Sequence, residues 1–143
     1  MRFSLHKLVL IIGIIFLSAC EGEILRKPSA GDTPGWLDGT PDIINITKTT
    51  IDLRLKTDRN ATIYFSVVNT YPDNQSPLQL KTGIPGAEIN GNFKINANEE
   101  IIYKVSNLTE DTQYYIFFLA EDLSNPPIEQ EETTFRLATT LAP

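Results

Sequence analysis

Few side chains of this 143-residue chain have the chemistry that catalysis requires. The single histidine, His6, and the single cysteine, Cys20, lie in or beside an apolar segment at the amino terminus. Serine and cysteine nucleophiles need a neighbouring base, and catalytic zinc sites are built mainly from histidine and cysteine. If the amino-terminal segment is removed as a signal peptide and Cys20 is modified, none of these constellations can form in the mature chain.

Paired carboxylates are the remaining candidates for acid–base chemistry. They stand at Glu99-Glu100, Glu121-Asp122 and Glu131-Glu132. Two carboxylates can act as general acid and general base, but adjacent acids at strand ends are far more often solvated surface. Glu121 and Asp122 could hold a calcium ion, yet the regular Asp and Asn spacing of a dedicated calcium loop is missing. We therefore expect no enzyme activity, no metal and no cofactor.

The first 19 residues have the pattern of a secretory signal peptide. Arg2, His6 and Lys7 give a positively charged start, and an apolar run over residues 8–17 follows it. This run is too short for a bilayer, which needs roughly 20 apolar residues, but it fits the apolar core of a signal peptide. We predict that residues 1–19 are removed from the mature protein.

The cleavage region, Leu17-Ser18-Ala19-Cys20, resembles the bacterial lipobox. The resemblance implies cleavage before Cys20, diacylation of its thiol, and a protein anchored to the bacterial cell envelope through its amino-terminal lipid. A lone cysteine in an exported chain cannot form an internal disulfide, and lipidation gives it a role. The alternative is an ordinary signal peptide with a cysteine near its cleavage site. Glu21 follows the cysteine instead of an aspartate, which favours the outer membrane.

The charge of the predicted mature chain is strongly negative. Removal of Arg2 and Lys7 leaves ten basic side chains against 18 acidic ones, a formal charge of −8. An acidic protein is repelled by nucleic acids and by anionic lipid headgroups. We expect no nucleic-acid partner.

The elements that must carry any site begin after a turn-rich segment, residues 20–40, which is predicted to be a lipidated tether. Within it, Trp36 is expected to fold back and close one end of the domain; the alternative is that it is presented to a ligand. From residue 41 apolar side chains alternate with polar ones, as in half-buried strands. Strands are predicted at residues 44–46, 51–55, 62–68, 93–95, 101–105, 114–122 and 133–139, the last with Phe135 and Leu137 inward.

One helical segment interrupts this series of strands. Ser76 is a favoured helix N-cap, Pro77 suits the first helical position, and Gly83 suits the position after the end. Seven short strands with one short helix indicate an all-β, antiparallel sandwich over residues 41–143.

The residues around the longest predicted strand indicate which kind of β-sandwich this is. Leu108, Thr112 and Tyr114, followed by apolar residues at every second position up to Ala120, resemble the tyrosine corner of a fibronectin type III domain. The segments 55–58, 62–68 and 76–77 resemble its bacterial variety. The resemblance implies a seven-stranded immunoglobulin-like sandwich in which the Tyr114 hydroxyl bonds to the backbone.

The other face of the same strand is more apolar than an open sheet face should be. If Tyr114 points inward, Tyr115, Phe117 and Leu119 point outward, with Tyr64 beside them on the neighbouring strand. The leucines of the predicted helix could cover this stripe, or a partner could. We hypothesise a lipid-anchored, non-catalytic module that uses these four residues to bind a protein or glycan of the envelope. The alternative is a structural accessory subunit or spacer without a ligand of its own.

Overall fold

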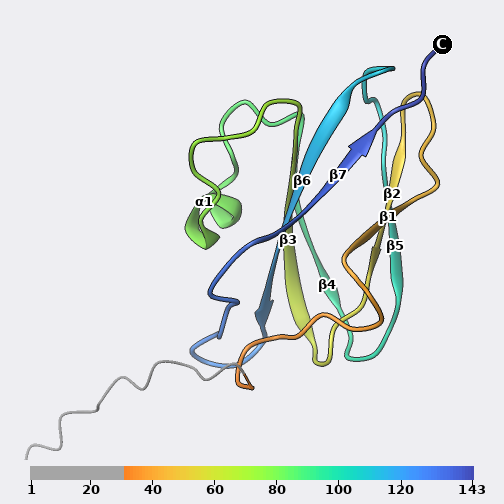
Figure 1. Cartoon of the computed structure of the whole chain (residues 1–143). Coiled ribbons are helices and arrows are strands. Elements are labelled where there is room, and N and C mark those ends of the chain that lie inside the picture. Colours follow the sequence, from red (N-terminus) through yellow and green to blue (C-terminus); the bar gives the residue numbers. More distant parts are fainter. Residues whose placement is uncertain (1–30) are drawn as a thin grey trace, which may run out of the picture.

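The computed structural model describes residues 31–143. The predictions for the signal peptide, the lipobox and Cys20 lie outside the described residues. The described part is an all-β structure of seven antiparallel strands in two sheets with one short helix, consistent with a β-sandwich (Figure 1). The elements are β1 (Asp42–Ile44), β2 (Ile51–Leu55), β3 (Ala61–Val68), α1 (Pro77–Thr82), β4 (Ile89–Ile95), β5 (Ile101–Val105), β6 (Gln113–Asp122) and β7 (Thr134–Thr139).

The two sheets have the strand orders β1-β2-β5 and β4-β3-β6-β7. Their inner faces carry the alternating apolar residues of β2, β3 and β6, as the period of two predicts. The fully buried members of this core include Ile51, Leu53, Leu55, Ile63, Phe65, Val67, Tyr114, Ile116, Phe118 and Ala120. The helix α1 lies in the connection from β3 to β4, outside the four-stranded sheet (Figure 1).

Two predicted strands have a different phase in the structure. β1 ends at Ile44, because Asn45 adopts a left-handed φ of 48° that breaks the strand, and Ile43 packs against the core instead of Ile44. On β7, Phe135 and Leu137 are 45% and 52% exposed, so the prediction that they point inward is wrong.

The strand register gives the reason for the correction on β7. Phe135 lies opposite Phe117 on β6, and Leu137 lies opposite Tyr115. Side chains opposite one another in a ladder point to the same face of a sheet, so both follow the outward-facing residues of β6. Ala138 is the buried apolar residue of β7.

The last residues of the predicted tether pack against the sandwich. The Trp36 ring meets Phe118 edge-on at a centroid distance of 6.4 Å, and its indole nitrogen donates to the Thr134 hydroxyl at 3.2 Å. The Leu37 amide donates to the Lys56 carbonyl at 3.0 Å. Trp36 therefore folds back onto the domain, as predicted.

The corner before β6 is held by Tyr114. Its hydroxyl accepts a hydrogen bond from the Thr109 amide at 2.9 Å, the type of contact that the motif predicts. Leu108 is buried beside it, and the Thr112 amide donates to the Thr140 hydroxyl at 3.0 Å. These contacts fix where β6 begins and so which of its residues face outward.

Replacing Tyr114 by phenylalanine is expected to lower the free energy of unfolding by about 1 kcal/mol, because the Thr109 amide loses its partner while the buried ring keeps its shape. Urea unfolding of the purified protein measures this loss. Tyr115→Phe is the matched control, since its hydroxyl makes only an exposed 3.4 Å bond to Gln113. Equal midpoints for the two variants would show that the corner bond does not stabilise the fold.

Candidate binding surface on the outer face of the four-stranded sheet

The predicted apolar stripe on the outer face of β6 is largely covered by the protein itself. Phe117 and Leu119 are fully buried, in a second apolar cluster with Val68, Leu80 and Ile84. The prediction that Phe117 and Leu119 belong to an exposed partner surface is therefore wrong. The reason is that α1 and the segment after it pack onto β6, as the alternative prediction proposed.

The helix that provides this cover has the predicted ends. The Ser76 hydroxyl accepts a hydrogen bond from the Gln79 amide at 3.4 Å, Pro77 is the first helical residue, and Gly83 has a φ of 94° after the last. Of the two leucines, Leu80 is buried but Leu78 is 70% exposed. Sequence reasoning did not identify Ile84, which follows the helix and takes the place expected for Leu78 in the cover.

A polar cluster holds the helix against β6. The Lys81 ammonium donates to the carboxylates of Glu121 and Glu129, and the Tyr64 hydroxyl donates to Glu121 at 3.2 Å. The hydrogen bond to Glu121 raises the pKa of Lys81 above its ordinary value. Burial, together with the charge of Glu121, raises the pKa of Tyr64. Tyr64, which was predicted in the partner surface, thus lies half-buried below the Lys81 ammonium.

The adjacent Asp122 stabilises a turn. Its Oδ1 atom accepts hydrogen bonds from the Ser124 amide at 3.2 Å, the Ser124 hydroxyl at 2.7 Å and the Ile128 amide at 2.7 Å. Burial opposes ionisation of this carboxyl group, but these hydrogen bonds outweigh it and lower its pKa. Within residues 31–143 no group of three or more His, Cys, Asp or Glu side chains could hold a metal ion.

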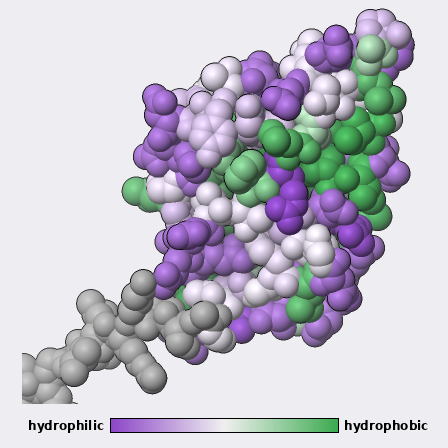
Figure 2. All heavy atoms as spheres, viewed as in Figure 1, coloured by the Kyte–Doolittle hydropathy of each residue, from purple (hydrophilic) through white to green (hydrophobic). Residues whose placement is uncertain are grey.

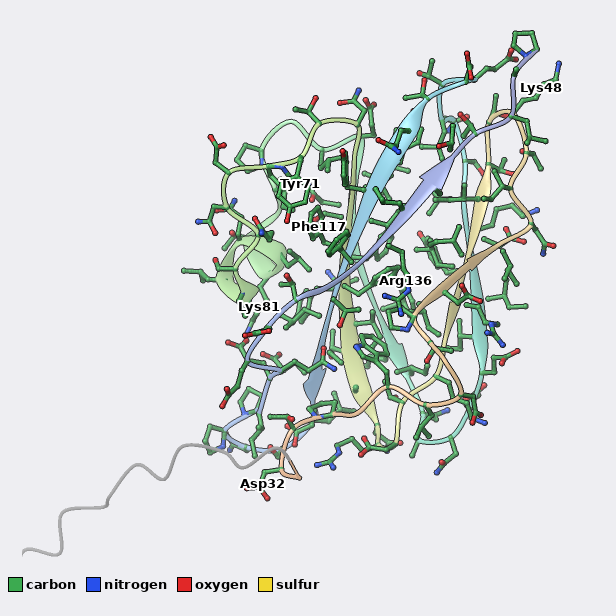
Figure 3. All side chains as sticks on the ribbon, viewed as in Figure 1. Asp32, Lys48, Tyr71, Lys81, Phe117 and Arg136 are labelled. Atoms are coloured by element: carbon green, nitrogen blue, oxygen red, sulfur yellow. The ribbon has the colours of Figure 1, made fainter. Side chains whose placement is uncertain are left out.

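What remains exposed on the outer face is an apolar patch beside α1, which we call the aromatic patch: Tyr71, Tyr115, Phe135 and Leu137. Tyr71, Phe135 and Leu137 are 47%, 45% and 52% exposed. The Tyr71 ring lies 5.2 Å from Tyr115 and 6.2 Å from Phe135, measured between ring centroids. Figure 3 shows Tyr71 close to Phe117, and Figure 2 shows hydrophobic residues gathered along β7 on the same side.

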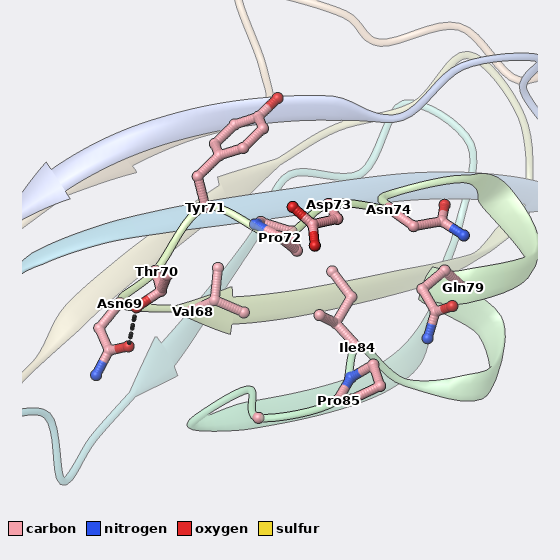
Figure 4. Close-up of a pocket in the computed structure, with 11 residues that line it drawn as sticks. Val68, Asn69, Thr70, Tyr71, Pro72, Asp73, Asn74, Gln79, Ile84 and Pro85 are labelled. Carbon is pink, nitrogen blue, oxygen red and sulfur yellow. Dashed lines mark hydrogen bonds between the residues drawn. The ribbon is translucent and has the colours of Figure 1, made fainter.

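A hollow of about 600 Å³ adjoins this patch (Figure 4). It lies between residues 68–74, Gln79 of α1 and residues 84–86, and we call it the loop hollow. Sequence reasoning identified neither Tyr71 nor this hollow, because residues 69–75 show no periodic pattern. Only the Pro and Asn residues of the segment indicated a loop.

No helix among the described residues is long and apolar enough to cross a membrane. Comparison of the chain with protein-family models, with curated proteins and with solved structures gives no match.

Proposed function

We propose that this chain is a lipid-anchored, non-catalytic binding module of the bacterial envelope, in which one fibronectin type III-like domain attaches to a protein or glycan partner. The envelope assignment rests on Leu17, Ser18, Ala19 and Cys20, which match the lipobox. Acylation at Cys20 would attach the chain to a membrane, and the residues after Cys20 favour the outer one.

Two observations support the fibronectin type III-like assignment. The strand orders β1-β2-β5 and β4-β3-β6-β7 contain the neighbours A-B-E and C-F-G of an immunoglobulin-like sandwich, and β4 pairs with β3 in the second sheet, where variable-type domains place strand C′. The bond between the Tyr114 hydroxyl and the Thr109 amide agrees with a tyrosine corner at the start of β6.

The aromatic patch is the observation that carries the binding function. Single exposed apolar residues are common on soluble proteins, whereas contiguous apolar surfaces mark interaction sites. Tyr71, Phe135 and Leu137 are exposed and adjoin the half-buried Tyr115. Aromatic side chains offer a large contact area at low entropic cost, and they are enriched at protein interfaces. The residues that bury Phe117 leave this neighbouring surface free.

A double variant on β7 tests the proposal. We expect Phe135→Ser combined with Leu137→Ser to reduce capture of the envelope partner at least tenfold, with little change in melting temperature, because both side chains are already half in solvent. The measurement is quantitative pull-down by the tagged, lipidated chain from detergent-solubilised membranes of its own bacterium.

Leu78→Ser combined with Leu123→Ser is the matched control, since these leucines are 70% and 50% exposed but lie outside the aromatic patch. We expect this control to keep full capture. Equal capture by the two double variants would exclude the aromatic patch as the binding surface.

The second candidate is a structural accessory subunit or spacer of an envelope complex. The observation that favours it is the intramolecular cover of Phe117 and Leu119, which leaves no fully apolar sheet face in need of a partner. A spacer predicts a fixed stoichiometric complex that survives mutation of the aromatic patch, and the same pull-down distinguishes the two.

A further inference from the structure

One wall of the loop hollow is the segment 84–86, which is hydrogen-bonded to Asn90. The Asn90 carbonyl oxygen accepts hydrogen bonds from the Ser66 hydroxyl at 2.6 Å and from the Ile84 amide at 3.0 Å, and the Asn90 amide group donates to the Ile84 carbonyl at 3.2 Å. Ser66 is fully buried and Ile84 is 2% exposed. This wall is therefore held in place by three part-buried hydrogen bonds of Asn90 and by the buried residues Ser66 and Ile84.

The opposite wall, residues 69–74, is also held in place. The Tyr71 ring packs on Tyr115 and Phe117 with centroid distances of 5.2 and 5.7 Å, and the Asn74 carbonyl oxygen accepts from the Ser76 amide at 3.0 Å. In Figure 4 the Tyr71 ring points away from the hollow toward β7 and so anchors the loop. A pre-formed hollow of about 600 Å³ has the size of a small-molecule site.

The polar groups that face the hollow retain unused hydrogen-bonding capacity. Asp73 makes no hydrogen bond or ion pair with any described residue, so both of its oxygens can accept. The Asn74 amide nitrogen and the Gln79 carbonyl oxygen are the unused halves of side chains whose other atoms bond to the Ser76 amide and to the Gly83 carbonyl. Below them, Val68 and Ile84 give the hollow an apolar floor (Figure 4).

This combination selects a class of ligand. Among the described residues that line the hollow there is no lysine, arginine or histidine, and the one charged group is the Asp73 carboxylate. Anionic ligands lack a counter-charge there and are repelled by Asp73. A cationic ligand finds only one carboxylate and no inward-facing aromatic ring. A ligand with several neutral hydroxyl groups and an apolar C–H face matches the acceptors, the donor and the floor.

We propose that the loop hollow binds a neutral sugar unit, with its hydroxyl groups on Asp73, Asn74 and Gln79 and its C–H face on Val68 and Ile84. Asp73 and Asn74 also line an adjoining hollow of about 500 Å³, so they can contact two successive units of a glycan. The inference rests on the proposed binding function and makes the partner a glycan.

The test is ligand-observed NMR with the mature, lipidated chain in detergent micelles. The probes are four neutral disaccharides, maltose, cellobiose, lactose and N,N′-diacetylchitobiose, together with chitobiose, the cationic counterpart of the last. At least one neutral probe is expected to bind. Asp73→Asn is expected to weaken that binding roughly tenfold or more, because a carboxylate accepts hydroxyl hydrogen bonds more strongly than an amide oxygen.

Glu110→Gln is the matched control. It also removes one carboxylate, but it lies at the corner before β6, and its side chain has no hydrogen bond or ion pair among residues 31–143. It is expected to leave sugar binding unchanged, and melting curves show that both variants stay folded.

Three results would overturn the inference: no binding of any neutral probe, stronger binding of chitobiose than of N,N′-diacetylchitobiose, or equal losses in Asp73→Asn and Glu110→Gln. If these occur while Phe135→Ser with Leu137→Ser still abolishes partner capture, the binding module stands and its partner is not a neutral glycan. If the capture test fails as well, the proposed function fails with the inference.

Discussion

Replacing Phe117 by alanine is expected to lower the free energy of unfolding by about 3–5 kcal/mol. Phe117 is fully buried in the second apolar cluster, with Leu80 and Ile84, and Tyr71 packs against its ring. Truncation would remove this apolar contact and leave a cavity that α1 cannot fill without leaving its polar anchors at Glu121. Because a domain of this size is stable by roughly 5–15 kcal/mol, the loss would be a large part of the total.

Phe135→Ala is the matched control for this prediction. Phe135 lies directly opposite Phe117 on β7 and on the same face of the sheet, but it is 45% exposed. Its truncation is expected to cost less than about 1 kcal/mol, since no closed cavity results. Urea unfolding with a common slope for the parent and both variants measures the two losses. A loss below about 1 kcal/mol for Phe117→Ala would mean that α1 does not cover β6 in solution.

The two phenylalanines separate two uses of one sheet face. The Phe117 side chain is buried when the protein folds, so its substitution affects stability. At Phe135 the side chain remains available, so its substitution affects partner capture. A hydropathy pattern cannot make this distinction, because both residues are equally apolar and both belong to strands.

Local chemistry predicted most of the elements. The alternation at Ile51, Leu53 and Leu55 indicates β2 because one face of a strand is buried and the other is not. Ser76 and Gly83 indicate the ends of α1 because each satisfies a backbone requirement that few other residues satisfy. These signals depend only on near neighbours in the chain.

The phase of β7 could not be predicted in the same way. A period of two shows that Phe135 and Leu137 share a face, but it does not show which face. The answer comes from the register with β6, where Phe135 meets Phe117 and not Phe118. Apolar side chains on both faces of β6 remove the usual contrast between inside and outside.

The candidate site was also beyond local reasoning. Its parts come from a loop at Tyr71, a helix at Leu80 and Gln79, and the segment at Ile84, which meet only after α1 packs on β6. In an irregular segment, the residues that make tertiary contacts do not recur at a regular spacing, so the sequence pattern does not predict these contacts. The sequence allowed the prediction that the helix covers the apolar stripe. It did not allow the prediction that the residues around the helix form a hollow.

The second large effect concerns attachment to the membrane. Cys20→Ala is expected to move the protein from the membrane fraction to the soluble fraction, because the proposed lipobox would then lack the thiol that we propose to be acylated. Each buried CH₂ of an acyl chain contributes about 0.8 kcal/mol, so one chain holds a protein only reversibly and two or more hold it stably. The change should therefore be nearly complete and should not depend on the fold of residues 31–143.

Ser29→Ala is the control for this experiment, since it changes a small residue of the predicted tether and leaves Leu17, Ser18, Ala19 and Cys20 intact. Fractionation in high salt, followed by mass spectrometry of the amino-terminal peptide, reads out both attachment and acylation. Salt matters because a charged chain that adhered by electrostatics would be released by it, whereas a lipid-anchored chain would not. Continued membrane attachment of Cys20→Ala in high salt would contradict the anchor and with it the envelope assignment, while leaving the aromatic patch and the loop hollow to be tested on their own.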